Sequence, residues 1–267
     1  MDNILWVIQQ NLISDEEYSN ITEALSVSHI SWMPVKIIPF TDRLEGIEKI
    51  DISKNIIAIG STNLINNVYK QNIWKPGVFF DPQKFNYRNW GEKYKDFLLN
   101  NDYEITTIEK LHKSFGKKDL FIRPLHDSKS FNGQVFTKKE FLEWTSPVMS
   151  YIKPDTEIVV STPKVIKKEW RFLVIENKII TGSLYRKNNK RCIDANYYKK
   201  ALEVAKIAAN IYSPHSVFVI DIGQIENEYR VIEVGCFNAA GFYACDTKKI
   251  VKQVSKYVQK QRVYYHE

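Results

Sequence analysis

The chain has 267 residues, of which 44% are hydrophobic and 13% aromatic, a composition typical of two or three compact folded lobes. Its apolar runs all fall short of the ~18 residues of a membrane span, and residues 1–10 lack the features of a signal peptide, so we expect a cytoplasmic protein with reduced cysteines. The net charge of +7 is spread over scattered lysines without interleaved aromatics, which disfavours nucleic acid as a partner.

Residues 1–103 read as a small α/β lobe. Apolar runs at 4–8, 35–38 and 56–59 predict strands, and helical patterns lie between them. Ser14 followed three residues later by Glu17 predicts the start of the first helix. The turn at 60–62 lacks the glycine pattern of a phosphate-binding loop. The lobe therefore carries no motif that names a ligand.

Residues 104–155 predict a strand, a polar loop, a second strand and a helix. The first strand stops at Pro124, because proline lacks the N–H that a central strand needs. Arg123 lies inside this apolar run, so its charge must find an anion, either a carboxylate or a ligand. The loop carries Lys129 and Gly133, and Thr137 is expected to cap a helix over 138–144. This order suits phosphate binding, but an ordinary hairpin has it too.

Residues 156–267 are expected to form a larger unit that contains a long hairpin over 169–186. Glu169 and Arg171 share one face of its first strand, because side chains repeat every two residues. Tyr185 and Arg186 end the second strand, either as substrate contacts or as a common strand-end pair. A helix over 196–211 and a last helix after Asp246 complete the unit.

A second hairpin over 217–234 is the most informative segment. Its two strands flank the turn at 226–228 and would bring Asp221 and Glu233 side by side. Two carboxylates and the amide oxygen of Asn238 facing one cavity would repel each other without a cation, and hard oxygen ligands favour Mg²⁺ or Mn²⁺. The alternative is a pair of surface acids beside an ordinary hairpin.

The order of these segments resembles the ATP-grasp fold. The sequence runs from IRP through a lysine-bearing loop and EWR to VIDI and VIEV, and then to an asparagine and a glycine. It is similar to a phage and bacterial clade defined by two arginines and one lysine, and also to ligases that add glutamate to proteins or cofactors. The resemblance covers about residues 104–250. It implies an α/β (α+β) protein with a pre-ATP-grasp lobe at 1–103 and an ATP-grasp domain at 104–267, divided at 155.

The resemblance also implies roles for individual residues. Arg123 and Lys129 would contact the phosphates of ATP, and Arg171 would face the transferred phosphoryl group. Backbone around Ser161 and Thr162 would bind adenine with Glu169 nearby, and Tyr185 and Arg186 are candidates for substrate contact. The metal ligands would be Asp221, Glu233 and Asn238. The family pattern places an asparagine two residues after the metal glutamate, where this chain has Gly235.

These roles together predict an ATP-dependent carboxylate–amine ligase with ATP and Mg²⁺ or Mn²⁺. The acid and amine are expected to be small molecules, amino acids or peptide termini, and the sequence assigns no oligomeric state. Two other classes stay open. One is a nucleotide-binding module without catalysis, and the other is a basic nucleic-acid-binding protein.

Overall fold

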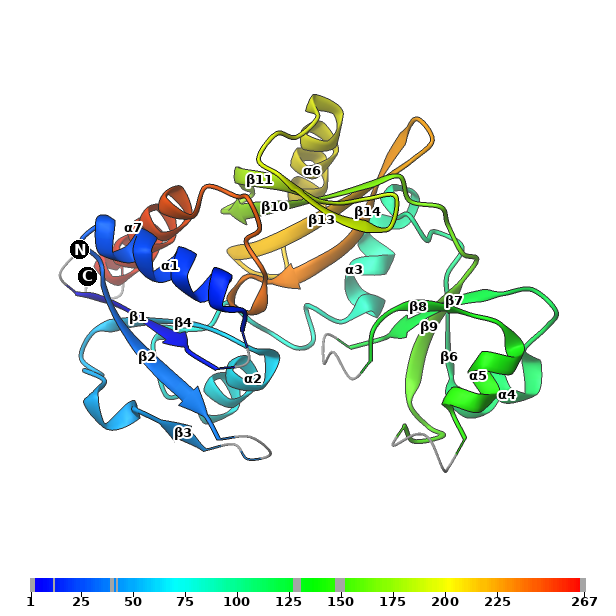
Figure 1. Cartoon of the computed structure of the whole chain (residues 1–267), viewed down its shortest axis with the longest axis horizontal. Coiled ribbons are helices and arrows are strands. Elements are labelled where there is room, and N and C mark those ends of the chain that lie inside the picture. Colours follow the sequence, from blue (N-terminus) through cyan, green and yellow to red (C-terminus); the bar gives the residue numbers. More distant parts are fainter. Residues whose placement is uncertain are drawn as a thin grey trace.

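The computed structural model of the chain describes residues 3–11, 13–38, 41, 43–126, 131–146 and 152–264. Three β-sheets with their helices make up this described part (Figure 1). Within it, no helix combines the length and apolar character needed to cross a membrane.

The first sheet belongs to the N-terminal lobe and has the strand order β3-β2-β1-β4-β5. Its three long strands are mutually parallel, and β1 is buried along its whole length, as expected for a sheet covered on both faces. Ser14 caps the first helix as predicted, since its Oγ accepts the Glu17 N–H. The elements are β1 (Ile4–Gln9), α1 (Asp15–Val27), β2 (Ser31–Ile37), β3 (Leu44–Glu45), η1 (Ile47–Lys49), β4 (Asn55–Ile59), α2 (Thr62–Gln71) and β5 (Pro76–Gly77).

The second sheet is antiparallel, with the order β6-β9-β7-β8. Its core gathers around Ile122 and Phe141, and a reciprocal capping box between Thr137 and Glu140 begins the predicted helix. Strand β9 completes this sheet, although the expected boundary at 155 assigned it to the following unit. The elements are β6 (Glu104–Thr107), α4 (Ile108–Ser114), β7 (Leu120–Pro124), β8 (Gln134–Phe136), α5 (Lys138–Trp144) and β9 (Glu157–Ser161).

The third sheet contains both predicted hairpins and has the order β12-β11-β10-β13-β14. Glu176 and Asn177 form the first turn with φ angles of 46° and 63°, a left-handed conformation that asparagine tolerates well. The elements are β10 (Lys168–Ile175), β11 (Lys178–Lys187), β12 (Lys190–Asp194), α6 (Lys199–Ile211), β13 (Val217–Ile225), β14 (Glu228–Cys236) and η3 (Phe237–Ala239).

The lobes share their cores across the expected boundaries. Helix α3 (Tyr87–Tyr94) comes from the N-terminal segment but packs with α6, and the Tyr94 hydroxyl donates to the Tyr212 carbonyl at 3.0 Å. Helix α7 (Thr247–Tyr264), at the other end of the chain, packs against α1 (Figure 1), and the buried indole of Trp6 donates to Ser255 Oγ at 2.9 Å. The N-terminal lobe and the third sheet are therefore joined at the core.

Candidate active site

The two hairpins of the third sheet bring four charged side chains to one face. Asp221 lies opposite Glu233 in the β13–β14 pair and opposite Arg171 in the β10–β13 pair. Glu169 follows on the same face, two residues before Arg171, and all four side chains line one cavity. The predicted juxtaposition of the two carboxylates is confirmed. The pairing of β10 with β13 also places Arg171 of the first hairpin next to Asp221 of the second.

Arg171 and Asp221 form a bidentate ion pair deep in the cavity. The guanidinium Nε lies 2.9 Å from Oδ1 and Nη2 lies 2.8 Å from Oδ2, while Nη1 donates to the Gly241 carbonyl at 3.2 Å. The side chain of Asp221 is 4% exposed and that of Arg171 is 16% exposed. Burial lowers the pKa of Arg171, but the charge and hydrogen bonds of Asp221 raise it by more, so the pKa lies above its ordinary value. Arg171 is thus held as a cation.

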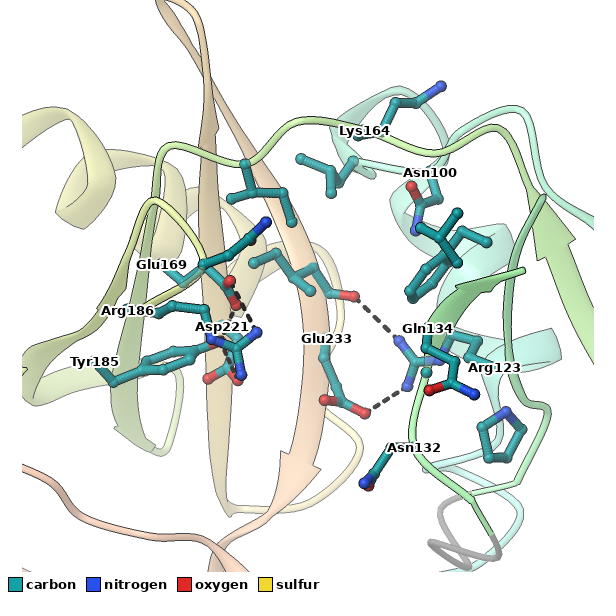
Figure 2. Close-up of a pocket in the computed structure, with 18 of the residues that line it drawn as sticks. Asn100, Arg123, Asn132, Gln134, Lys164, Glu169, Tyr185, Arg186, Asp221 and Glu233 are labelled. Atoms are coloured by element: carbon teal, nitrogen blue, oxygen red, sulfur yellow. Dashed lines mark hydrogen bonds and ion pairs between the residues drawn. The ribbon is translucent and has the colours of Figure 1, made fainter. Parts of the chain in front are cut away.

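Arg123 approaches from the second sheet on the opposite side of the cavity (Figure 2). Its guanidinium pairs with the Glu233 carboxylate and lies over two buried rings, 5.1 Å from the centroid of Tyr87 and 5.5 Å from that of Trp90. Such aromatic faces favour a cation. Of the two anions that the sequence allowed, the described structure supplies the carboxylate.

A hydroxyl bridges two of the carboxylates. Tyr185 Oη donates to Glu169 Oε2 at 2.7 Å and lies 3.2 Å from Asp221 Oδ2, while Arg186 Nη1 bonds Glu169 Oε1 at 3.1 Å. Burial, followed by the two carboxylates, raises the pKa of Tyr185, so the phenol keeps its proton. The Tyr185 ring also stacks on Tyr243 with centroids 5.0 Å apart. Tyr185 is therefore placed to orient acidic groups.

These side chains surround a cavity of about 480 Å³ between the second and third sheets. Lys164 and Asn100 lie at one end, and Asn132 from the segment before β8 lies toward the other (Figure 2). Gly133 packs closely on β7, where an added Cβ would lie 2.9 Å from the Phe121 ring. Lys129, the expected phosphate contact, falls outside the described residues.

The side chain of Asn238, an expected metal ligand, forms hydrogen bonds elsewhere in the fold. Asn238 is fully buried, and its Oδ1 accepts the Phe79 N–H at 2.7 Å while its Nδ2 donates to the Ala58 carbonyl at 2.6 Å. Both polar ends of the amide hold the N-terminal lobe against the third sheet, and Asn238 is not among the residues that line the cavity in this arrangement. The altered spacing at Gly235 was the signal for this difference.

Ser161 and Thr162, the expected adenine contacts, also lie outside the lining of the cavity. Ser161 is buried in β9, and the Thr162 N–H donates to Asp102 Oδ2 at 3.1 Å. Neither residue is among those that line the cavity. Burial raises the pKa of Asp102, but hydrogen bonds from Thr162 and Lys164 lower it by more. This carboxylate therefore stays charged and holds the segment after β9, which contains Thr162 and Lys164 and is here called the linker. The Thr162 amide is thus already engaged.

Sequence reasoning missed Asn100, Lys164 and Tyr243. Asn100 and Lys164 come from connecting segments without a motif, and their positions depend on contacts between lobes. Tyr243 adopts a φ of 52°, rare for a bulky residue, and its ring lies 5.2 Å from the Arg171 guanidinium. Tyr243 and Gly241 also line a second cavity of about 380 Å³, which includes Glu17 and Arg191. Arg171 therefore lies at the wall between two cavities.

The acidic pair fits a metal bound together with phosphates. The part of the chain that is described holds no group of three His, Cys, Asp or Glu side chains arranged for a metal. Mg²⁺ commonly uses one or two carboxylates and completes its shell with phosphate oxygens and water. Asp221 and Glu233 supply two carboxylates on adjacent strands, each now balanced by an arginine. The donors suit Mg²⁺ or Mn²⁺ when a nucleotide brings the remaining oxygens.

Comparison with known families identifies the family of the chain. A family model described as an ATP-grasp domain, family 2 of its clade, matches residues 100–253, more than half of the chain. The chain belongs to this family. The resemblance inferred from sequence is confirmed, as is the ATP-grasp fold. No curated protein matches the chain in sequence.

Solved structures show the same fold at low sequence identity. D-alanine–D-alanine ligase from Bacillus anthracis in complex with ATP is 11% identical, with a TM-score of 0.64, and the match covers 99% of this chain and 100% of the ligase. D-cycloserine synthetase DcsG is 8% identical, with a TM-score of 0.65 and coverage of 96% and 99%. The ATP-grasp ligase PsnB, complexed with a minimal precursor, is 12% identical, with a TM-score of 0.53 and coverage of 90% and 92%.

Proposed function

We propose that this ATP-grasp protein is an ATP-dependent carboxylate–amine ligase that works through an acyl phosphate. The observation that carries the proposal is the position of Arg171, a partly buried cation beside Asp221 at the wall between two cavities. Arg123 faces it across the larger cavity. Phosphoryl transfer depends mainly on positioning and charge neutralisation, and cations on both sides of a phosphate chain supply both.

The nucleotide would lie in the larger cavity, with its phosphates near Arg123. If the phosphates paired with the Arg123 guanidinium, the Glu233 carboxylate would be able to hold Mg²⁺ or Mn²⁺. When bound with Asp221 and Glu233, the metal would neutralise part of the phosphate charge. We also assign a phosphate contact to Lys129, on the family resemblance alone.

In the reaction, a carboxylate oxygen of the acid attacks the γ-phosphorus, and the bond to the β-phosphate oxygen breaks to release ADP. Arg171 stabilises the charge on the phosphoryl oxygens. An amine then attacks the acyl carbon, phosphate departs with the oxygen that came from the acid, and the nitrogen loses a proton to give an amide. Tyr185 holds Glu169 and Asp221 in place throughout.

The second cavity would bring the acid or the amine close to Arg171, since Tyr243 lines both cavities and the carbonyl of Gly241, which lines the second, accepts from Arg171. Its mixture of acidic and basic side chains suits an amino acid or a peptide terminus. Several of the similar structures are named as ligases of D-alanine or complexes with precursor peptides, which agrees with this class. We expect the activity in the cytoplasm, where ATP is abundant.

A screen for ADP release tests the proposal. Purified protein with Mg²⁺ and ATP is given pools of amino acids and peptides, and products are identified by mass spectrometry. The proposal predicts ADP, phosphate and an amide from one pool, and loss of all three in Asp221→Asn and Glu233→Gln. ATP binding without ADP release in any pool would favour a non-catalytic module, and a salt-dependent shift of oligonucleotides would favour nucleic-acid binding.

A further inference from the structure

We propose that Asn100 reads the base of the bound nucleotide and selects adenine. This inference rests on the proposed nucleotide site but concerns its other end. The backbone amide of Thr162 is committed to Asp102, so the linker cannot offer that group to a base without losing an existing hydrogen bond. Asn100 is a further polar group in the lining of the cavity, and its amide can distinguish one base from another.

Asn100 is held rigidly at both flanks. On one side, Leu98 pairs with Val231 in a β-bridge, and the Leu99 N–H donates to the Val231 carbonyl at 2.9 Å. On the other, Asp102 bonds Thr162 and forms an ion pair with Lys164 at 3.1 Å. The short segment therefore spans from the edge of the third sheet to the linker after β9. Its anchoring fixes the Asn100 backbone before a ligand arrives.

The Asn100 side chain lines the cavity at the end away from Tyr185 and Asp221 (Figure 2). The residue is 9% exposed, and among the described residues nothing forms a hydrogen bond with its amide. The amide faces the cavity, so its carbonyl and NH₂ can both form hydrogen bonds with a ligand there.

Apolar side chains beside Asn100 suit a flat base. Leu99, Ile166 and Ile232 line the same cavity. Ile166 and Ile232 lie together over Gly223, where an added Cβ would come within 3.4 Å of the first and 2.9 Å of the second. The absence of a side chain at Gly223 leaves room for this apolar surface.

The chemistry of an amide matches adenine. Its carbonyl accepts a hydrogen bond from the N6 amino group while its NH₂ donates to the adjacent ring nitrogen, the pairing by which asparagine reads adenine in DNA. On the corresponding edge guanine presents O6 and N7, which are both acceptors, so the amide carbonyl would face an acceptor. Asn100 therefore distinguishes the two purines by hydrogen-bond polarity.

The test compares ATP, GTP and purine riboside triphosphate, which lacks the N6 amino group, by calorimetry without acid or amine. Wild-type protein should bind ATP on the order of ten- to a hundredfold more tightly than either analogue. In Asn100→Ala, the three nucleotides should bind within about threefold of each other, because the group that separates them is gone. Asn100→Ser provides a second variant, and thermal unfolding of both confirms that they fold.

Asn132→Ala is the matched control, since it truncates the same type of side chain in the same cavity toward the opposite end. It should weaken ATP and GTP by a common factor and leave their ratio unchanged. If wild-type protein binds ATP, yet Asn100→Ala and Asn100→Ser keep the full preference for it, the inference is overturned while the proposed nucleotide site stands. Wild-type protein that binds none of the three would overturn both.

Discussion

Replacing Arg171 should lower the free energy of unfolding, because its partner Asp221 is left as a buried charge. Arg171→Ala leaves the Asp221 carboxylate, 4% exposed, without its guanidinium. Breaking a buried pair in this way typically costs about 3–5 kcal/mol in the free energy of unfolding. With an unfolding entropy of about 2 cal/mol/K per residue over 267 residues, the midpoint temperature of thermal unfolding should fall by about 6–9 °C.

The double variant Arg171→Ala/Asp221→Asn separates charge burial from lost contacts. It removes the uncompensated carboxylate, so it should recover about 2 kcal/mol or more of the loss seen in Arg171→Ala. Arg88→Ala is the control, because Arg88 pairs with Glu157 on the surface with side chains 55% and 44% exposed. Truncating this exposed pair should change stability by at most about 1 kcal/mol.

The assays are thermal unfolding for the midpoint temperature and urea unfolding for the free energy, both followed by circular dichroism at pH 7 without nucleotide or metal. ADP release measured on the same preparations should fall at least about a hundredfold in Arg171→Ala, and Arg171→Lys should restore only part of it because lysine lacks the bidentate fork. The reasoning fails if Arg171→Ala is no less stable than Arg88→Ala, or if the double variant is as unstable as Arg171→Ala.

Three further predictions concern other parts of the chain. Arg123→Ala should weaken ATP binding at least about tenfold in calorimetry, because it removes a charged phosphate contact; unchanged affinity would refute that contact. Burial, and then Lys84, lower the pKa of His215, so stability should fall as pH drops from about 7 through the ordinary value near 6.5; His215→Gln should lose this slope, and an equal slope in the variant would exclude His215 as its source. Iodoacetamide at pH 8 should label Cys192 and spare Cys236 and Cys245, because both of these are buried and burial raises the pKa of the Cys245 thiol to about 12. Equal labelling of the three cysteines in mass spectrometry would contradict the packing.

Local patterns in the sequence were sufficient to predict the hairpin geometry. The alternation of side chains along a strand placed Glu169 and Arg171 together, and the turn at 226–227 fixed the register of Asp221 against Glu233. Helix starts at Ser14 and Thr137 followed from their capping residues, because a cap is decided within one turn. These features depend on neighbours in sequence or on the adjoining strand.

Contacts between lobes were beyond such patterns. Asn238 follows strand β14, which carries Glu233, yet its amide bonds Ala58 and Phe79, more than 150 positions earlier in the chain. Asn100 and Asp102 likewise gain their places from Val231 and Thr162. A single sequence gives no indication of which distant carbonyl will meet a given amide. Residues in connecting segments were therefore the ones misassigned or missed.

Oxygen transfer from the acid substrate to phosphate tests the acyl-phosphate route most directly. Once the screen has identified the acid and amine, the acid is labelled with ¹⁸O in its carboxylate and the released phosphate is examined by mass spectrometry. The account predicts one ¹⁸O atom in each phosphate, because the attacking carboxylate oxygen stays bonded to phosphorus when the amine displaces it. Phosphate without label, alongside a formed amide, would contradict it.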